Sequence, residues 1–412
     1  MATIALLGTM DTKGDEHGFI ADLIRRRGHE PLIIDLGTSG NPQLKPDIDR
    51  HEAAAMAGLD LAPILAQQDR GAAVTAMSRI APIVLVKLQA EGRIQGVISL
   101  GGGGGTAIAT AGMRNLPIGF PKLMVSTLAS GNTAQYVGVK DIVMMPSIVD
   151  IAGLNRISRQ ILTRAAGAIC GMVENEPAAE AVTDRPIIVA SMFGNTTECV
   201  RVARSILENE GFEVLVFHAT GIGGRTMESL IESGLVAGVL DVTTTEWADE
   251  LVGGVLGAGP HRMEAAAKHG VPAVVAPGCL DMVNFHAPET VPEKFAGRRF
   301  YHHNPQVTLM RTNPDECAEL GRILAEKVNL STGPVTVLLP LGGVSVISAT
   351  GQPFHDPAAD AALFQAIETG CRHDIPVVKS SAAINDPEFA ELCAKALLSQ
   401  IKTHVEARSA RR

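Results

Sequence analysis

The sequence is poor in aromatic residues and carries no excess of positive charge. Among its 412 residues there are one Trp and two Tyr, and the formal net charge is −9. Proteins that bind nucleic acid stack bases on aromatic side chains and meet the phosphate backbone with Lys and Arg. The composition therefore argues against nucleic acid as a partner.

Signals for export and for disulfide bonding are also missing. Met1 leads directly into an apolar segment without a preceding basic region, and we expect that no apolar run is long enough to span a bilayer. The six cysteines form no Cys-x-x-Cys pair, which is typical of reduced, buried thiols. These absences predict a cytoplasmic protein that does not bind a membrane.

What the sequence does contain is one plan that occurs twice. In each half a strand, a turn, a helix and a second strand follow one another. In the first half the strand, helix and second strand are expected at 4–7, 16–27 and 31–36, and in the second half at 187–190, 198–210 and 214–218. Buried strands that alternate with amphipathic helices are typical of βαβ units. We therefore predict an α/β fold, with two Rossmann-like doubly wound domains whose mostly parallel sheets face a central cleft.

The predicted domains are an amino-terminal one at 1–178 and a carboxy-terminal one at 179–412. The segment 173–186 between them is acidic, carries two prolines and lacks apolar periodicity, so it is interpreted as a linker. The helix expected near 387–399 is the candidate for crossing between the domains.

The first candidate site is the loop that follows the first strand. Its members are Gly8, Thr9, Met10, Asp11, Thr12, Lys13, Gly14, Asp15 and Glu16. Free N–H groups at a helix start attract anions, so loop amides and the Thr9 and Thr12 hydroxyls would bind phosphate while Lys13 supplies charge. The alternative is ordinary helix capping, which explains the acids but not a lysine beside the positive end of a helix.

The second candidate is a run of glycines between a buried strand and an apolar helix. It comprises Gly101, Gly102, Gly103, Gly104 and Gly105, followed by Thr106. Each ordered glycine costs about 0.5–1 kcal/mol relative to alanine, so a nest of bare N–H groups around an anion is favoured over a flexible linker. Neither this run nor the first loop matches the GxxxxGK[ST] or GxGxxG motif.

Two further groups would complete a pocket in the first half. Asp35 ends the second strand, where dinucleotide-binding folds place a ribose-binding carboxylate, although it could equally cap the turn after it. Another predicted strand end supplies the hydroxyls and amides of Ser126, Thr127, Ser130 and Gly131.

The second half offers polar residues without a fixed spacing. Asp281, His302 and neighbouring histidines invite a metal hypothesis, but nothing places them on one face, and we predict no metal ligands. Arg311 could clamp a carboxylate or phosphate, or form a surface ion pair. Cys279 could be a nucleophile, although a buried, inert thiol is more common.

Several of these stretches together resemble a known family. The sequences GTMDTKGDE, GGGGGT, GIGGRTME and PGCLDMVNF resemble uncharacterised protein family 0261, which is related to the ATP-binding domain of the tomato mosaic virus resistance protein. The resemblance covers nearly the whole chain. It implies two Rossmann-like domains, a nucleotide-binding first half and a homodimer, with the family's loops at 8–13 and 101–106.

The predicted function is binding of ATP or another adenine nucleotide, with or without Mg²⁺, together with a small phosphate- or carboxylate-bearing molecule at the cleft. In an enzyme acting on a small organic acid, Lys13 would hold the anion and Arg311 would orient it. Asp11, Asp281 and His302 would be the acid/base groups. The alternatives are a non-catalytic module whose nucleotide occupancy sets its affinity for a protein, and a metal-dependent hydrolase using second-half His and Asp.

Overall fold

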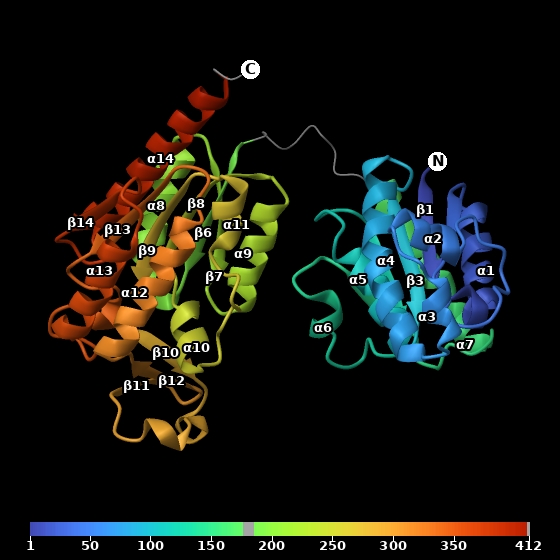
Figure 1. The fold of residues 1–412 in the computed structure, drawn as a ribbon, viewed down its shortest axis with the longest axis horizontal. Coiled ribbons are helices and arrows are strands. Elements are labelled where there is room, and N and C mark those ends of the chain that lie inside the picture. The colour runs from blue at the N-terminus through green and yellow to red at the C-terminus, as the bar shows by residue number, and fades with distance from the viewer. Residues whose placement is uncertain (176–184, 410–412) are drawn as a thin grey trace. The chain divides into compact units, whose positions relative to one another are not determined.

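A computed structural model describes residues 1–175 and 185–409 (side chains to 406), shown in Figure 1. The chain divides into two compact units, Met1–Ala181 and Val182–Arg412. The predicted boundary between residues 178 and 179 lies outside the described residues. The predicted linker starts too early, because the helix α7 (Arg156–Glu174) covers its first two residues.

The first unit is built on a five-stranded parallel sheet in the order β2-β1-β3-β4-β5. Its strands are β1 (Thr3–Gly8), β2 (Glu30–Asp35), β3 (Gly96–Gly101), β4 (Lys122–Ser126) and β5 (Val143–Pro146). Its other helices are α1 (Met10–Arg26), α2 (Arg50–Met56), α3 (Ala62–Ala66), α4 (Arg70–Ala90), α5 (Gly103–Met113) and α6 (Ala134–Val137).

Both faces of this sheet are covered, because successive side chains of a strand point to opposite sides. Ala5 and Leu7 of β1 pack in the core formed with α2, α4 and α5. Ile4 and Leu6 pack in the core formed with α1 and α7. The near-continuous apolar strands of the sequence are therefore explained by burial on both faces.

The helix after β1 begins earlier than predicted. Lys13 N and Thr12 N both donate to Thr9 O, at 3.0 and 3.2 Å, and close a helical turn at Met10. The helix is kinked at Lys13, whose φ and ψ are −137° and 31°. Most of the expected loop is therefore the first, distorted part of α1.

The second unit repeats the same strand order and extends it by one strand. Its six-stranded sheet runs β14-β13-β9-β8-β6-β7, again parallel, and a three-stranded antiparallel sheet runs β10-β12-β11. The main strands are β6 (Ile187–Met192), β7 (Glu213–His218), β8 (Val236–Thr243), β9 (Ala273–Gly278), β13 (Val335–Pro340) and β14 (Val377–Ser380). The smaller sheet contains β10 (Met282–Phe285), β11 (Phe300–Asn304) and β12 (Val307–Arg311).

The helices of the second unit lie on both faces of its sheet (Figure 1). They are α8 (Thr197–Asn209), α9 (Ile222–Glu232), α10 (Glu246–Val252), α11 (Glu264–His269), α12 (Pro314–Asn329), α13 (Pro357–Gly370) and α14 (Pro387–Ser409). Short 3₁₀ turns are η1 (Gly194–Thr196), η2 (Pro288–Thr290), η3 (Glu293–Phe295) and η4 (Val346–Ser348). The candidate crossing helix, α14, packs Phe389, Leu397 and Ile401 into the core of this unit. The predicted α/β class, with two mostly parallel sheets, is confirmed.

One helix corrects the expectation that no apolar run is long enough to span a bilayer. By length and composition α4 could do so, with a mean hydropathy of 1.5 over an 18-residue window. In the structure, however, Met77, Ile80, Val84 and Leu88 of α4 are buried in the core of the first unit. The apolar composition of α4 thus serves packing against α5 and the sheet.

We predict that Gly321→Ala destabilises the second unit, because α12 and α13 touch at this glycine. A Cβ on Gly321 would lie 2.6 Å from Leu363 O and 2.7 Å from Ala366 Cβ. Overpacking of this kind costs about 1–3 kcal/mol of unfolding free energy. Urea unfolding followed by the fluorescence of Trp247, the single tryptophan, measures it.

Gly194→Ala is the matched control, since a Cβ there meets open space. Equal unfolding midpoints for the two variants would contradict the close helix approach.

Candidate functional site

A cavity lies where the chain reverses direction across the first sheet. From β1 the chain moves to β2 on one side and then returns to β3 on the other side of β1. The loops that leave β1 and β3 therefore diverge, which opens a crevice at the carboxyl ends of the strands. A cavity of about 740 Å³ occupies this place. Its lining comprises Thr9, Thr12, Lys13, Thr38, Ser39, Leu65, Gln68, Asp69, Arg70, Ala73, Val74, Gly102, Gly103, Gly104, Gly105, Ile108 and Asp150.

The start of α5 faces this cavity without a cap. At the other two helix starts beside the cavity, side chains accept backbone hydrogen bonds. Asp69 Oδ1 accepts from Gly71 N at 2.8 Å, and Asp35 Oδ1 accepts from Met10 N at 3.0 Å. By contrast, the N–H groups of residues 103–105 have no acceptor within the described residues. A helix start with three open donors is a favourable place for an anion.

The glycines of this run are needed for different reasons. A Cβ on Gly101 would lie 3.0 Å from Gly105 Cα, so this glycine allows the helix to start close to the strand. A Cβ on Gly103 or Gly104 would have its nearest neighbour at 3.9 or 3.5 Å, which is ordinary contact distance. Packing therefore does not require glycine at 103 and 104, whereas a ligand approaching the backbone would.

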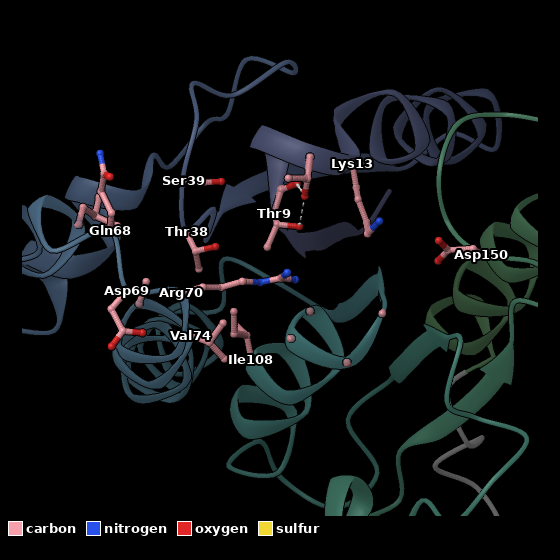
Figure 2. Close-up of a pocket in the computed structure, with 17 residues that line it drawn as sticks. Thr9, Lys13, Thr38, Ser39, Gln68, Asp69, Arg70, Val74, Ile108 and Asp150 are labelled. Atoms are coloured by element: carbon pink, nitrogen blue, oxygen red, sulfur yellow. Dashed lines mark hydrogen bonds between the residues drawn. The ribbon is translucent and has the colours of Figure 1, made fainter.

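Two cations reach into the cavity from different elements, as Figure 2 shows. Lys13 comes from the kink in α1, and its Nζ donates to the carbonyl of Ile151. Arg70 opens α4, and its Nη2 lies 4.0 Å from the position of a Cβ on Gly104. Arg70 has no hydrogen bond or ion pair within the described residues. A cation at the positive end of a helix is unfavourable unless an anion compensates it.

Sequence reasoning missed Arg70. The sequence feature that could have identified Arg70 is the Asp69-Arg70 pair at the start of an apolar helical pattern. Such a pair indicates a capped helix with a cation in its first turn. Thr38, Ser39 and Gln68 also line the cavity and were not predicted as ligand contacts, whereas Asp150 lines it from a strand-to-helix turn that the sequence pattern places at the same edge.

Asp35 does not face the cavity. It is 1% exposed, its Oδ1 accepts from Met10 N and Gly37 N, and its Oδ2 accepts from Arg50 Nε at 3.2 Å. Arg50 also donates to the carbonyls of Ser39 and Gly40, at 3.2 and 2.6 Å. Asp35 and Arg50 thus hold the turn after β2, as the capping alternative for Asp35 predicts. This turn presents Thr38 and Ser39 to the cavity.

Asp11 supports the same turn. Its Oδ2 accepts from Ser39 N at 2.8 Å and from Ser39 Oγ at 3.0 Å. Its Oδ1 is buried with no hydrogen-bond partner in the described residues, and it lies 2.9 Å from the position of a Cβ on Gly37. Asp11 therefore lies behind the cavity wall and does not line the cavity itself.

Other predicted contacts also lie in the walls of the cavity or away from it. Met10 is buried in the core, and the ring of His17 packs directly on Gly8. Thr106 and Ser126 bind each other, with 2.7 Å between their hydroxyl oxygens, and join α5 to β4. Thr127, Ser130 and Gly131 are not among the lining residues.

Of the second-half candidates, Asp281 and Arg311 are neighbours, and His302 lies on a different strand. Asp281 is fully buried, with Oδ2 accepting from Ser345 Oγ at 2.7 Å. Arg311 pairs with Asp360 at 2.5 Å and donates to Phe354 O at 2.9 Å. His302 is exposed on β11 and joins neither group. Burial raises the pKa of Asp281 to about 6, while Arg311 and Ser345 act in the opposite direction.

Neither a metal site nor a reactive cysteine appears among these residues. Within residues 1–175 and 185–409, no three His, Cys, Asp or Glu side chains gather in a way that could hold a metal ion. Cys279 is fully buried, and burial raises the pKa of its thiol well above the usual value. Cys279 is therefore better explained as a buried, inert thiol than as a nucleophile.

The corresponding edge of the second unit is occupied by its own side chains. Thr196 Oγ1 lies 2.8 Å from Thr243 Oγ1, and Ser191 Oγ accepts from Thr243 N at 2.9 Å. The start of α9 is also satisfied internally, because Glu246 accepts from Gly221 N and Gly224 N and pairs with Arg262. At these positions the second unit therefore fills its strand ends with hydrogen-bonded side chains, whereas the first unit has glycines and two cations beside its cavity.

Fold and cavity together define a protein of two doubly wound α/β units with an anion-favouring cavity in the first. The chain belongs to the Uncharacterised protein family (UPF0261). Residues 2–178 match the family's N-terminal domain and residues 185–401 match its C-terminal domain.

Relatives from bacteria and plants align along nearly the whole chain. A UPF0261 protein of Clostridium tetani is 50% identical, covering 97% of this chain and 99% of its own length. Another, from Rhizobium meliloti, is 49% identical and covers 95% and 97%. The tomato ToMV resistance protein Tm-1(GCR237) is 37% identical, covering 98% of this chain but 57% of the longer tomato protein.

Similarity to solved structures is weaker. A UDP-N-acetylglucosamine 2-epimerase from Rickettsia bellii is 10% identical, covers 99% of this chain and 98% of its own, and has a TM-score of 0.23. The Acinetobacter baumannii MurG is 12% identical, covers 96% and 100%, and also has a TM-score of 0.23. Scores this low carry no information about the ligand of the present chain.

The pKa of Asp281 predicts a pH-dependent effect of Asp281→Asn on stability. Because burial raises the folded-state pKa from 3.8 to about 6, the native state keeps a proton that the unfolded chain loses between those values. The carboxyl group therefore destabilises the fold as pH rises through this window. Relative to the unchanged protein, Asp281→Asn should be about 1–3 kcal/mol more stable at pH 8 than it is at pH 4.

Urea unfolding monitored by Trp247 fluorescence at the two pH values measures this difference. An identical stability difference at pH 4 and pH 8 would show that Asp281 is not held protonated by burial.

Proposed function

We propose that the first unit binds an adenine nucleotide, with its phosphates at the start of α5 between Lys13 and Arg70. The observation that carries the proposal is the meeting of three uncapped glycine N–H groups and two cations at one cavity. Donors and cations that converge from separate elements are the arrangement used for phosphate recognition.

The rest of the cavity suits the uncharged part of a nucleotide. Its volume of about 740 Å³ falls within the range of small-molecule sites, which is about 300–1,000 Å³. Leu65, Val74 and Ile108 supply an apolar wall on which a base could lie, and the Thr38 hydroxyl has no partner within the described residues. The choice of adenine rests on the resemblance to an ATP-binding domain.

The proposed activity is binding rather than a chemical step. Asp11 lies behind the wall, and Asp281 and His302 belong to the other unit, so none of the predicted acid/base groups lines this cavity. Lys13 is accordingly assigned to holding phosphate. This assignment favours the nucleotide-dependent binding module over the enzyme acting on an organic acid.

Removal of either cation should weaken ATP binding without unfolding the protein. A hydrogen bond to a charged group contributes about 1.5–3 kcal/mol, so Lys13→Ala and Arg70→Ala should each raise the Kd for ATP about 10- to 100-fold. Isothermal titration calorimetry measures the affinity directly. Arg79→Ala is the matched control for Arg70, because Arg79 is exposed on the same helix and does not line the cavity.

If wild-type protein shows no heat and no thermal stabilisation with ATP, ADP or AMP at millimolar concentration, nucleotide binding is wrong. If ATP binds and both cation variants bind it normally, the site lies elsewhere in the chain.

Substitutions at Gly104 and Gly101 distinguish a glycine required for ligand binding from a glycine required for packing. Gly104→Val should fold normally, because a Cβ there makes only ordinary contact with Val74, but the added methyl groups should obstruct the phosphate and weaken ATP binding at least about tenfold. Gly101→Ala should instead lower the melting temperature, since its Cβ meets the backbone at Gly105. Circular dichroism melting and calorimetry together distinguish the two effects, and normal ATP binding by Gly104→Val would contradict the proposed phosphate position.

A further inference from the structure

The proposed phosphate end of the cavity also contains a carboxylate. Asp150 lines the cavity beside Lys13, as Figure 2 shows, and its side chain is directed toward that end. The other carboxylate of the lining, Asp69, lies at the opposite end, where its Oδ1 caps α4 through Gly71 N and Ala72 N. Asp150 is therefore the acidic group of the lining that would meet the phosphates.

The loop that carries Asp150 is fixed to α1 at two points. Lys13 Nζ donates to the carbonyl of Ile151, and Gly153 N donates to Glu16 Oε1 at 2.6 Å. Asp150 Oδ1 accepts from Ile151 N at 2.8 Å, whereas its Oδ2 has no hydrogen bond within the described residues. One oxygen of a held carboxylate thus remains available for a ligand.

Asp150 does not serve as the ion-pair partner of the nearby cation. The described ion pairs include none between Lys13 and Asp150, and the ammonium group is directed to a backbone carbonyl instead. A carboxylate beside a bare polyphosphate would repel it, since like charges that share a site destabilise each other. The same carboxylate becomes favourable when a divalent cation lies between it and the phosphate.

We propose that Asp150 is the protein ligand for a magnesium ion that enters with the phosphates of the nucleotide. Mg²⁺ keeps several waters and is commonly held by one or two carboxylates together with substrate phosphates. A single protein carboxylate is therefore sufficient for this kind of site. This inference rests on the proposed nucleotide site and adds to it the ionic form of the ligand.

The hydrogen bond from Lys13 Nζ to Ile151 O fixes the position of the loop that carries Asp150. Because Lys13 donates to Ile151 O, the residue after Asp150, the same side chain orders the loop and lies next to the phosphates. Lys13→Ala should accordingly weaken binding of both metal-free and magnesium-bound ATP. Asp150→Asn should separate these two forms.

The test is calorimetric titration of the full-length chain with ATP, either with excess Mg²⁺ or with EDTA. Wild-type protein should bind magnesium-bound ATP about tenfold or more tightly than metal-free ATP. Asp150→Asn should bind magnesium-bound ATP more weakly than wild type and metal-free ATP more tightly, because the substitution removes both the metal ligand and the repulsion. A general loss of the fold would weaken both and cannot produce this reversal.

Asp22→Asn is the matched control, because Asp22 is exposed on α1 and does not line the cavity. Its magnesium dependence should equal that of wild type. Mn²⁺ provides a second readout, since its electron paramagnetic resonance signal should broaden with ATP and wild-type protein but not with ATP and Asp150→Asn.

The outcomes distinguish the two proposals. ATP binding with the same magnesium dependence in wild type and Asp150→Asn overturns the metal site and leaves nucleotide binding intact. Absence of ATP binding under both conditions overturns nucleotide binding and the metal site together.

Discussion

The parallel pairing of β1 with strands on both of its sides is the constraint on which the first unit depends. β1 pairs with β2 from Thr3 to Gly8 and with β3 from Ile4 to Leu7. Both faces of β1 are buried, so its register cannot shift without exposing a complete set of apolar side chains. This register places the end of β1 beside the end of β3, and the cavity follows from the opposite directions in which the chain then leaves them.

Buried ionic groups support the cavity without forming its surface. Arg50 and Asp35 hold the turn after β2, and Asp11 holds Ser39 in the same turn. In the second unit the buried Arg262 plays a related structural part, pairing with Asp241, Glu246 and Glu228. Buried charges of this kind are tolerated because each meets opposite charges or backbone donors, and they are consequently unavailable to a ligand.

The two units share one plan but carry different side chains at the corresponding strand ends. Both have the same order in their first five strands, with a change of direction next to the first strand of each. In the second unit, the Thr196 and Thr243 hydroxyls bind each other at this edge, and the Glu246 carboxylate accepts from Gly221 N and Gly224 N at the start of α9. In the first unit, the backbone donors of residues 103–105 at the start of α5 remain open beside Lys13 and Arg70.

The sequence by itself determined the α/β class, the repeated plan and the glycine-rich strand ends, because these depend on local periodicity and on the conformational cost of glycine. The cavity is lined by Lys13, Thr9, Thr12 and residues 102–105, which the sequence predicts as candidate ligand contacts. Only the tertiary structure decided which other polar groups reach it. Asp35 turns inward because Arg50, 15 residues away, supplies its partner, and Lys13 meets Ile151 across 138 residues. Arg70 comes from a segment that the fold alone brings to this edge, since no local pattern encodes the distance between two parts of the chain.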